Sequence, residues 1–136
     1  MNNLEKTLSI IKPDAVERGL EKEIKDQFLN NDFKIVEEKK IKISKSEAEE
    51  FYKVHQTKPF YNDLCSYLSS GPIVVMILEK NNAILANRDL MGATDPKKAK
   101  DGTIRKKYGI SIDKNSVHGS DSLENAEIEI KFFFKD

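Results

Sequence analysis

Several residue types are scarce in this chain of 136 residues, and each scarcity argues against a class of protein. Cys65 is the only cysteine, so an intrachain disulfide is impossible and a reducing compartment is expected. No apolar run approaches the roughly 20 residues that a membrane-spanning helix needs. The first residues also lack the pattern of a secretory signal peptide. The sequence therefore predicts a cytoplasmic protein without membrane segments.

Net charge is absent too, because 23 basic side chains balance 23 acidic ones. A neutral chain argues against nonspecific nucleic-acid binding, which depends on Lys and Arg displacing counterions. The balance is uneven along the sequence, since residues 80–107 carry eight basic and three acidic residues. Such a segment is a candidate binding place for a small anion. Charge alone, however, favours an ordinary exposed loop.

The length and the 38% apolar content fit a single domain over residues 1–136. Apolar periodicity predicts strands at 7–11, 33–43, 73–78 and 115–118 and helices at 20–31, 46–55, 60–68, 82–92 and 122–134. Residues 95–109 are expected to form a long loop with a short helix. Within 33–43, apolar residues stand at even spacing, which predicts one covered face. Ser46-Glu47-Ala48-Glu49 has the form of a helix-starting capping box.

This order of elements contains four strands and two crossover helices. It predicts an α/β (α+β) fold of the ferredoxin-like βαββαβ type. The sheet would be four-stranded and antiparallel, with the helices packed on one of its faces.

The chain has only two histidines. His118 lies in Asn-Ser-Val-His-Gly-Ser-Asp-Ser, where a packed polar residue and a nucleophile in a cleft fit equally well. A nucleophile would be a neutral ring with one nitrogen free to attack phosphorus and the other bonded to a carboxylate. His55 ends a predicted helix, where interaction of a partly exposed histidine with the helix dipole is the simpler interpretation.

Phosphate-binding loops are absent, since neither Gly-x-x-x-x-Gly-Lys-Ser/Thr nor Gly-x-Gly-x-x-Gly occurs. Cationic and hydroxyl side chains remain as candidate phosphate ligands, namely Lys12, Arg88, Thr94 and Arg105. Each one alone is better explained as a surface residue, and only their meeting in space would make a site. No spacing of Cys, His, Asp or Glu predicts a protein metal site, so Mg²⁺ would arrive with a polyphosphate.

The segment Asn115-x-x-His118-Gly119-Ser120-Asp121-Ser122 resembles the active-site signature of the nucleoside diphosphate kinases. Further collinear blocks extend the resemblance over essentially the whole chain, at residues 7–16, 51–52, 58–61, 90–96 and 102–105. A signature of eight residues with these flanking blocks is highly specific. It moves the interpretation of His118 toward the nucleophile.

The resemblance implies ping-pong transfer of the γ-phosphate from a nucleoside triphosphate to a diphosphate through a phosphorylated His118. Glu129 would bond the other ring nitrogen, and Lys12 would assist catalysis. Phosphate and ribose contacts are implied for Lys12, Tyr52, Arg88, Thr94, Arg105 and Asn115, and base stacking for Phe60 with Ile112. Stacking tolerates every base, so ATP and other nucleoside di- and triphosphates are expected substrates. Mg²⁺ bound with the nucleotide and a homotetramer or homohexamer are also implied.

The chain departs from the family pattern in two places. Residues 101–108 read DGTIRKKY where relatives commonly have PGTIRGDF, which bears on contacts between subunits. The chain also ends two residues after Phe134, as expected of a short bacterial-type member. Two other functions stay in view: a catalytically silent nucleotide-binding or scaffold member, and a nucleic-acid-binding regulator. The intact residue set argues against the first, and only the basic segment supports the second.

Overall fold

Four antiparallel strands form one sheet in a computed structural model that describes residues 4–112 and 114–134. The strand order is β2-β3-β1-β4, with β2 at Lys34–Ile41, β3 at Ile73–Asn81, β1 at Leu4–Ile11 and β4 at Val117–Gly119. This is the predicted ferredoxin-like α/β arrangement. Over the described residues, no helix is long and apolar enough to cross a membrane.

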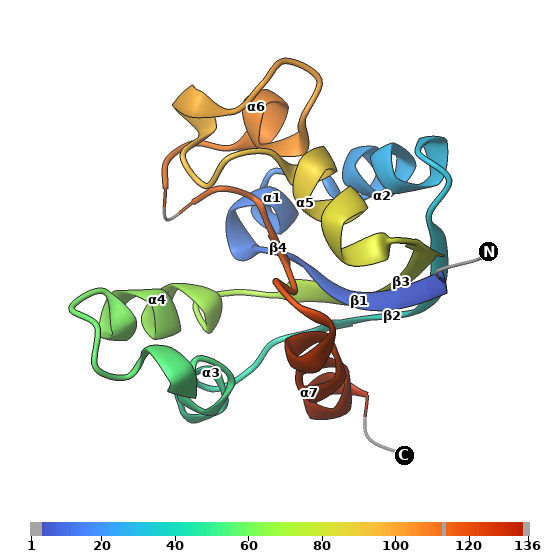
Figure 1. The fold of residues 1–136 in the computed structure, drawn as a ribbon. Coiled ribbons are helices and arrows are strands. Elements are labelled where there is room, and N and C mark those ends of the chain that lie inside the picture. Colours follow the sequence, from blue (N-terminus) through green and yellow to red (C-terminus); the bar gives the residue numbers. More distant parts are fainter. Residues whose placement is uncertain (1–3, 113, 135–136) are drawn as a thin grey trace.

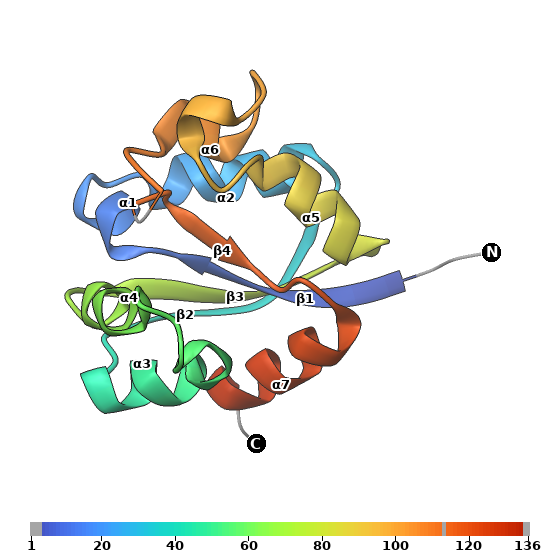
Figure 2. The same cartoon turned by 60° about the vertical axis from the view of Figure 1, so that its left-hand side comes forward.

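Helices cover both faces of the sheet (Figures 1 and 2). One face carries α1 (Pro13–Glu17), α2 (Glu21–Asn30), α5 (Ala83–Met91) and α6 (Ile104–Tyr108). The other carries α3 (Lys45–Phe51), α4 (Tyr61–Leu68) and α7 (Leu123–Phe133). Short 3₁₀ turns occupy Lys53–His55 and Pro96–Lys98. The expectation that helices pack on one face only is therefore wrong.

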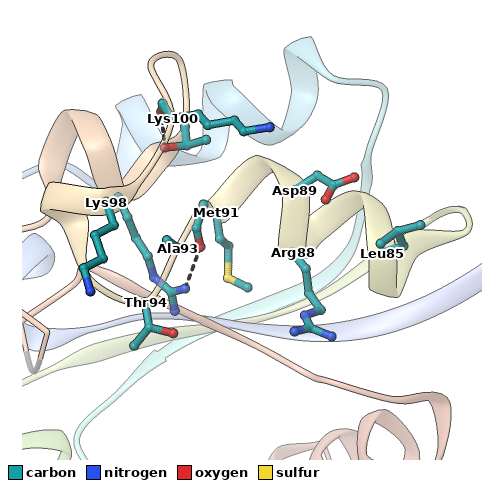
Figure 3. A pocket seen from close by; sticks show the side chains of 11 residues that line it. Leu85, Arg88, Asp89, Met91, Ala93, Thr94, Lys98 and Lys100 are labelled. Atoms are coloured by element: carbon teal, nitrogen blue, oxygen red, sulfur yellow. Dashed lines mark hydrogen bonds between the residues drawn. The ribbon is translucent and has the colours of Figure 1, made fainter.

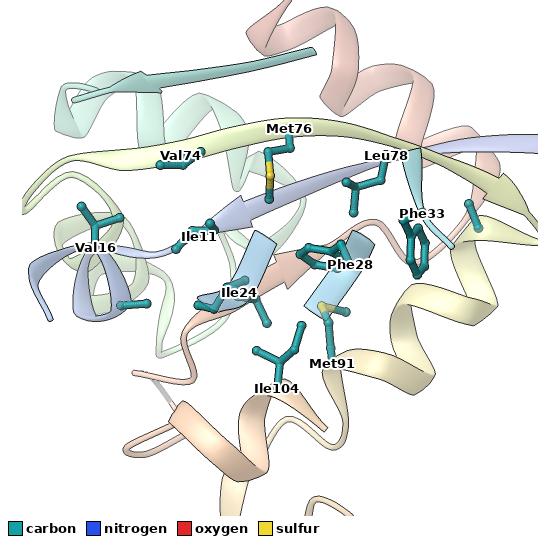
Figure 4. Close-up of a cluster of buried hydrophobic side chains, with 13 residues drawn as sticks. Ile11, Val16, Ile24, Phe28, Phe33, Val74, Met76, Leu78, Met91 and Ile104 are labelled. Atoms are coloured by element: carbon teal, nitrogen blue, oxygen red, sulfur yellow. The ribbon is translucent and has the colours of Figure 1, made fainter. Parts of the chain in front are cut away.

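The reason for two helical layers lies in the central strand β3. Its residues 73–78 are all buried. Val74, Met76 and Leu78 belong to the first core cluster, which α2, α5 and α6 complete (Figure 4). Ile73 and Val75 belong to a second cluster on the opposite face, with α3, α4 and α7. A continuous apolar run exposes side chains to both faces, so both must be covered.

Strand β2 differs from its predicted pattern. Phe33 and Ile35 pack with the first core cluster, whereas Ile41 and Ile43 pack with the second. The pairing with β3 shifts by one residue between Ile35 and Glu37. A β-bulge turns every later side chain to the other face, so even spacing across it does not mark one face.

Helix boundaries also differ in detail from those expected. The capping box of α3 is formed by Ser44 and Glu47, not by Ser46 and Glu49. The Ser44 hydroxyl accepts from the Glu47 amide at 3.0 Å, and the Glu47 carboxylate accepts from the Ser44 amide at 3.0 Å. Both pairs have the same Ser-x-x-Glu spacing, and only the backbone path selects between them. Helix α1 was expected as a turn, and the 46–55 helix ends at Phe51.

Gly92 ends α5, as predicted, and starts the segment that carries the candidate phosphate ligands Thr94 and Arg105. Its φ is +86°, and a Cβ there would stand 2.6 Å from the Thr103 hydroxyl oxygen. Glycine is therefore required for both conformation and space. The missing side chain lets residues 92–103 fold back on α5.

We expect Gly92→Ala to lower the free energy of unfolding by about 3 kcal/mol, because backbone strain and overpacking act together. Gly102→Ala is the matched control, since Gly102 has φ +88° but nothing within 4 Å of a Cβ. That variant should lose only about 1 kcal/mol. Urea denaturation measures both. Equal losses would contradict a steric role for Gly92.

Candidate active site

His118 lies on β4, the short edge strand that pairs with β1 through Ile10 opposite His118. Its Nε2 is 3.1 Å from Oε1 of Glu129, which α7 presents from the second helical layer. The Ser120 hydroxyl donates to the same oxygen at 2.7 Å, and it accepts from the Leu8 amide at 3.2 Å. The carboxylate is thus held by two donors.

This contact determines which ring nitrogen of His118 carries a proton. A carboxylate accepts hydrogen bonds, so in the neutral imidazole Nε2 carries the proton and Nδ1 has the lone pair. The Phe51 ring packs edge-on against the imidazole, with centroids 5.4 Å apart. The side chain remains 20% exposed. His118 is therefore oriented, accessible and in the tautomer that a nucleophile needs.

Arg105 is a buried cation held by backbone carbonyls. It is 9% exposed, and its Nη1 and Nη2 donate to the carbonyls of Gly92 at 3.0 Å and Val117 at 2.9 Å. Burial lowers its pKa to about 10, so it stays charged at neutral pH. Within residues 4–112 and 114–134, no carboxylate forms an ion pair with it, and its Nε has no hydrogen-bond partner. Such a group is electrostatically suited to an anion.

Lys12, Asn115 and Thr94 meet although they are far apart in the sequence. Lys12, 6% exposed at the end of β1, donates from Nζ to Oδ1 of Asn115 at 2.9 Å. The Asn115 amide nitrogen donates to the Thr94 carbonyl at 3.1 Å. The side chain of Asn115 therefore joins the start of the chain to the segment after α5.

A cavity of about 710 Å³ lies between α5 and the segment that follows it. Three of the candidate phosphate ligands line it, namely Arg88, Thr94 and Arg105. In Figure 3, Arg88 and Thr94 lie at its edge nearest the sheet, and Lys100 lies at the opposite edge. Two hydrogen bonds connect the cavity lining to the other candidates. Arg105 donates to the Val117 carbonyl, next to His118, and Asn115 donates to the Thr94 carbonyl. The basic segment of the sequence thus surrounds a cavity and is not merely an exposed loop.

The remaining candidates, Tyr52, Phe60 and Ile112, lie in different settings. Tyr52 is buried in the second core cluster, and burial, with a smaller effect of Glu129, raises the pKa of its hydroxyl. Phe60 and Ile112 are 46% and 56% exposed. The Phe60 ring stands 6.0 Å from the His55 ring, measured between centroids. Two apolar side chains left exposed are free to contact a planar ligand.

Sequence reasoning did not find the setting of His55. It lies in the 3₁₀ turn after α3, between Tyr52 and Phe60. Burial lowers the pKa of its imidazole, and the nearby Lys58 adds to this effect. His55 stands in the last turn of this 3₁₀ segment and is half-buried, so the expectation of a partly exposed histidine at a helix end agrees with its position. Apolar periodicity in the sequence could not reveal the setting of His55, because the regular helix α3 ends at Phe51, four residues before it.

Known proteins resemble the chain over nearly its whole length. The model of the nucleoside diphosphate kinase family matches residues 5–136. A nucleoside diphosphate kinase of Campylobacter jejuni is 60% identical over 132 residues, which cover 97% of this chain and 96% of that protein. One of Wolinella succinogenes is 57% identical over 131 residues, covering 96% of each.

Solved structures agree with the sequence comparison. The nucleoside diphosphate kinase of Aquifex aeolicus superposes with a TM-score of 0.95 at 40% identity, covering 97% of this chain and 96% of its own. That of Encephalitozoon cuniculi gives 0.93 at 36% identity, covering 97% and 90%. Fold, site geometry and sequence lead to one conclusion: the chain belongs to the nucleoside diphosphate kinase family.

Proposed function

We propose that the chain transfers the γ-phosphate of a nucleoside triphosphate to a nucleoside diphosphate in two steps through His118. In the first step, Nδ1 attacks the γ-phosphorus, the bond to the β-phosphate oxygen breaks, and the diphosphate leaves. In the second step, a β-phosphate oxygen of another diphosphate attacks the phosphohistidine and the N–P bond breaks. One site serves both nucleotides in turn.

The observation that carries this proposal is the hydrogen bond between Nε2 of His118 and Glu129. It leaves Nδ1 as the nucleophile. It also places a carboxylate beside the nitrogen on which positive charge develops as Nδ1 forms its bond to phosphorus. Because Nε2 keeps its proton throughout, the ring needs no separate base.

Cationic side chains supply the second part of the proposal. Phosphoryl transfer passes through a loose transition state with charge spread over the equatorial oxygens, so catalysis rests on positioning and electrostatics. Lys12, Arg88 and Arg105 are assigned to these oxygens. The burial of Arg105 without a carboxylate partner in the described residues supports its role, since a phosphate would compensate its charge.

The other candidates are assigned to the nucleotide's remaining groups. Tyr52, Thr94 and Asn115 are proposed to donate to phosphate and ribose oxygens. The exposed Phe60 and Ile112 are proposed to hold the base between them. Stacking uses the face that all bases share, which supports broad base specificity.

Mg²⁺ fits this site only as a companion of the nucleotide. Across the part of the chain that the structure describes, no group of three or more His, Cys, Asp or Glu side chains could hold a metal ion. The proposed phosphate ligands include no carboxylate, the side chain through which proteins usually bind Mg²⁺. We therefore assign the ion to the nucleotide phosphates, where it neutralises charge and orients them.

We also propose that the chain forms a homotetramer or homohexamer in the cytoplasm. Strand β2 is an edge strand, and the apolar side chains of Val36 within it and of Leu29 on the neighbouring α2 are exposed. An open edge with apolar neighbours supports contact with a second copy. The free, buried Cys65 supports a reducing compartment. Sedimentation distinguishes the two assemblies.

Incubation with γ-labelled ATP should give a phosphoprotein that is stable in alkali and labile in acid, with one phosphate per chain. His118→Asn should abolish the label, because it removes the nucleophile. His55 is the only other histidine in the sequence, and His55→Asn should still be labelled. Filter binding after quenching at both pH extremes measures the label. Label on His118→Asn would contradict the mechanism, and nucleotide binding without label in the wild type would favour a silent member.

Glu129→Gln should slow phosphorylation of His118 by about 10- to 100-fold, because the neutral amide no longer offsets the charge on the ring. Glu127→Gln is the matched control, since this exposed glutamate lies on the same helix away from the ring. Rapid-quench kinetics measure both. Equal rates in the two variants would contradict the role of Glu129.

Phe60→Ala should weaken nucleotide binding about 5- to 100-fold through lost stacking, to a similar extent for adenosine, guanosine and thymidine diphosphates. Leu29→Ala, another exposed apolar residue, should bind as the wild type does. Calorimetric titration gives the affinities. A loss confined to one base would point to selective recognition and contradict a stacking platform.

A further inference from the structure

Ser116 holds an unfavourable backbone conformation between Asn115 and the strand of His118. Its φ is +74°, a region that residues with a Cβ rarely adopt. The Val117 amide donates across it to the Asn115 carbonyl at 2.9 Å, which closes a γ-turn. Such conformations persist only where the surroundings hold them, and they gather at functional sites. The contacts of Ser116 therefore bear on how its neighbours are aimed.

Three hydrogen bonds hold the turn. The Ser116 carbonyl accepts from the Lys12 amide at 2.8 Å. Its hydroxyl donates to Oδ2 of Asp14 at 3.0 Å and accepts from Nη2 of Arg18 at 3.2 Å. Ser116 is fully buried, so these partners replace water completely. The turn is thus fastened to the residues that follow β1.

Arg18 extends this attachment to a third segment. Its guanidinium also bonds the Asp14 carbonyl at 3.1 Å and the Asp14 carboxylate at 3.2 Å. It donates as well to the carbonyl of Tyr108, the last residue of α6, whose second residue is Arg105. Behind Asp14, the Tyr67 hydroxyl of α4 donates to the carboxylate and accepts from the Asp14 amide. One arginine therefore joins the segments that carry Lys12, Arg105 and Asn115.

None of the three side chains of this cluster lines the cavity beside α5. Arg18 is hydrogen-bonded to Asp14, Tyr108 and Ser116 and is not among the residues that line the cavity. Ser116 is bonded to the Lys12 amide and lies between Asn115 and Val117, so the cluster reaches Lys12 by a hydrogen bond and Asn115 and His118 along the chain.

We propose that Arg18, Asp14 and Ser116 form a positioning network for phosphoryl transfer. The network holds the turn at Ser116, and the turn sets the directions of Asn115 and His118 relative to Lys12. The proposal rests on the function proposed above. It assigns to Arg18 a role without contact to the nucleotide, unlike the roles of Arg88 and Arg105.

The test compares the rate of His118 phosphorylation with nucleotide affinity in Arg18→Ala. We expect the single-turnover rate to fall about tenfold or more, while the Kd for ADP changes by less than about threefold. A misaimed nucleophile impairs the transition state more than ground-state binding. Lys22→Ala is the matched control, since Lys22 forms an exposed ion pair with Asp26 one turn further on.

Chemical rescue separates positioning from general stability. The Arg18 side chain is 37% exposed, so guanidinium ion at millimolar concentration can reach the space that Arg18→Ala leaves. Guanidinium should restore part of the lost phosphorylation rate in Arg18→Ala. It should not change the rate of the wild type or of Lys22→Ala. A wild-type rate in Arg18→Ala, or a slow rate in the folded variant that guanidinium does not raise, would overturn the network.

Substitutions of Ser116 test the turn itself. Ser116→Gly adopts a positive φ without strain but lacks the hydroxyl, whereas Ser116→Ala lacks the hydroxyl and keeps the strain. We expect His118 to be phosphorylated slowly in both variants, and we expect guanidinium to raise neither rate. Full activity of Ser116→Gly would show that only backbone freedom matters and would overturn the role of the hydroxyl. A wild type that forms no phosphohistidine would instead overturn the proposed function itself.

Discussion

One carboxylate oxygen fixes the geometry around His118. Oε1 of Glu129 receives hydrogen bonds from the His118 ring and from the Ser120 hydroxyl, and Ser120 is itself bonded to the backbone of β1. The imidazole therefore has one tautomer and one orientation. This holds only while α7 stays docked, and α7 docks because Phe133 packs among Leu8 and other residues of the second core cluster.

The strand that carries His118 is held from both faces of the sheet. From one side, α7 contributes Glu129 to the ring. From the other, Arg105 at the start of α6 bonds the Val117 carbonyl. Two helical layers are thus a condition of the site as well as of the core, because each supplies one group to β4. The helical layers that bury β3 on both faces are therefore the same layers that fix the geometry around His118.

The sequence predicted much of this, and the errors have physical causes. Short apolar runs located β1 and β3, and Gly92 correctly ended a helix. The prediction that the apolar residues of β2 share one face was wrong because of a β-bulge. The bulge inserts one residue, and nothing in the composition of the segment indicates it. The wrong serine was predicted to cap α3 because Ser44 and Ser46 are each followed three residues later by a glutamate. Helices were placed on one face, although a fully apolar strand already requires cover on two.

The sequence by itself determined which chemical groups are available: two histidines, no phosphate-binding glycine loop, and a basic segment at residues 80–107. Its signature around His118 also indicated the family. Only the tertiary structure decided that Arg105 is a buried cation, that Asn115 joins Lys12 to Thr94, and that Arg18 stands behind the turn at Ser116. Those facts depend on segments up to 103 residues apart meeting at the ends of β1 and β4. The sequence shows which groups exist, whereas packing sets the distances between them and how deeply each is buried.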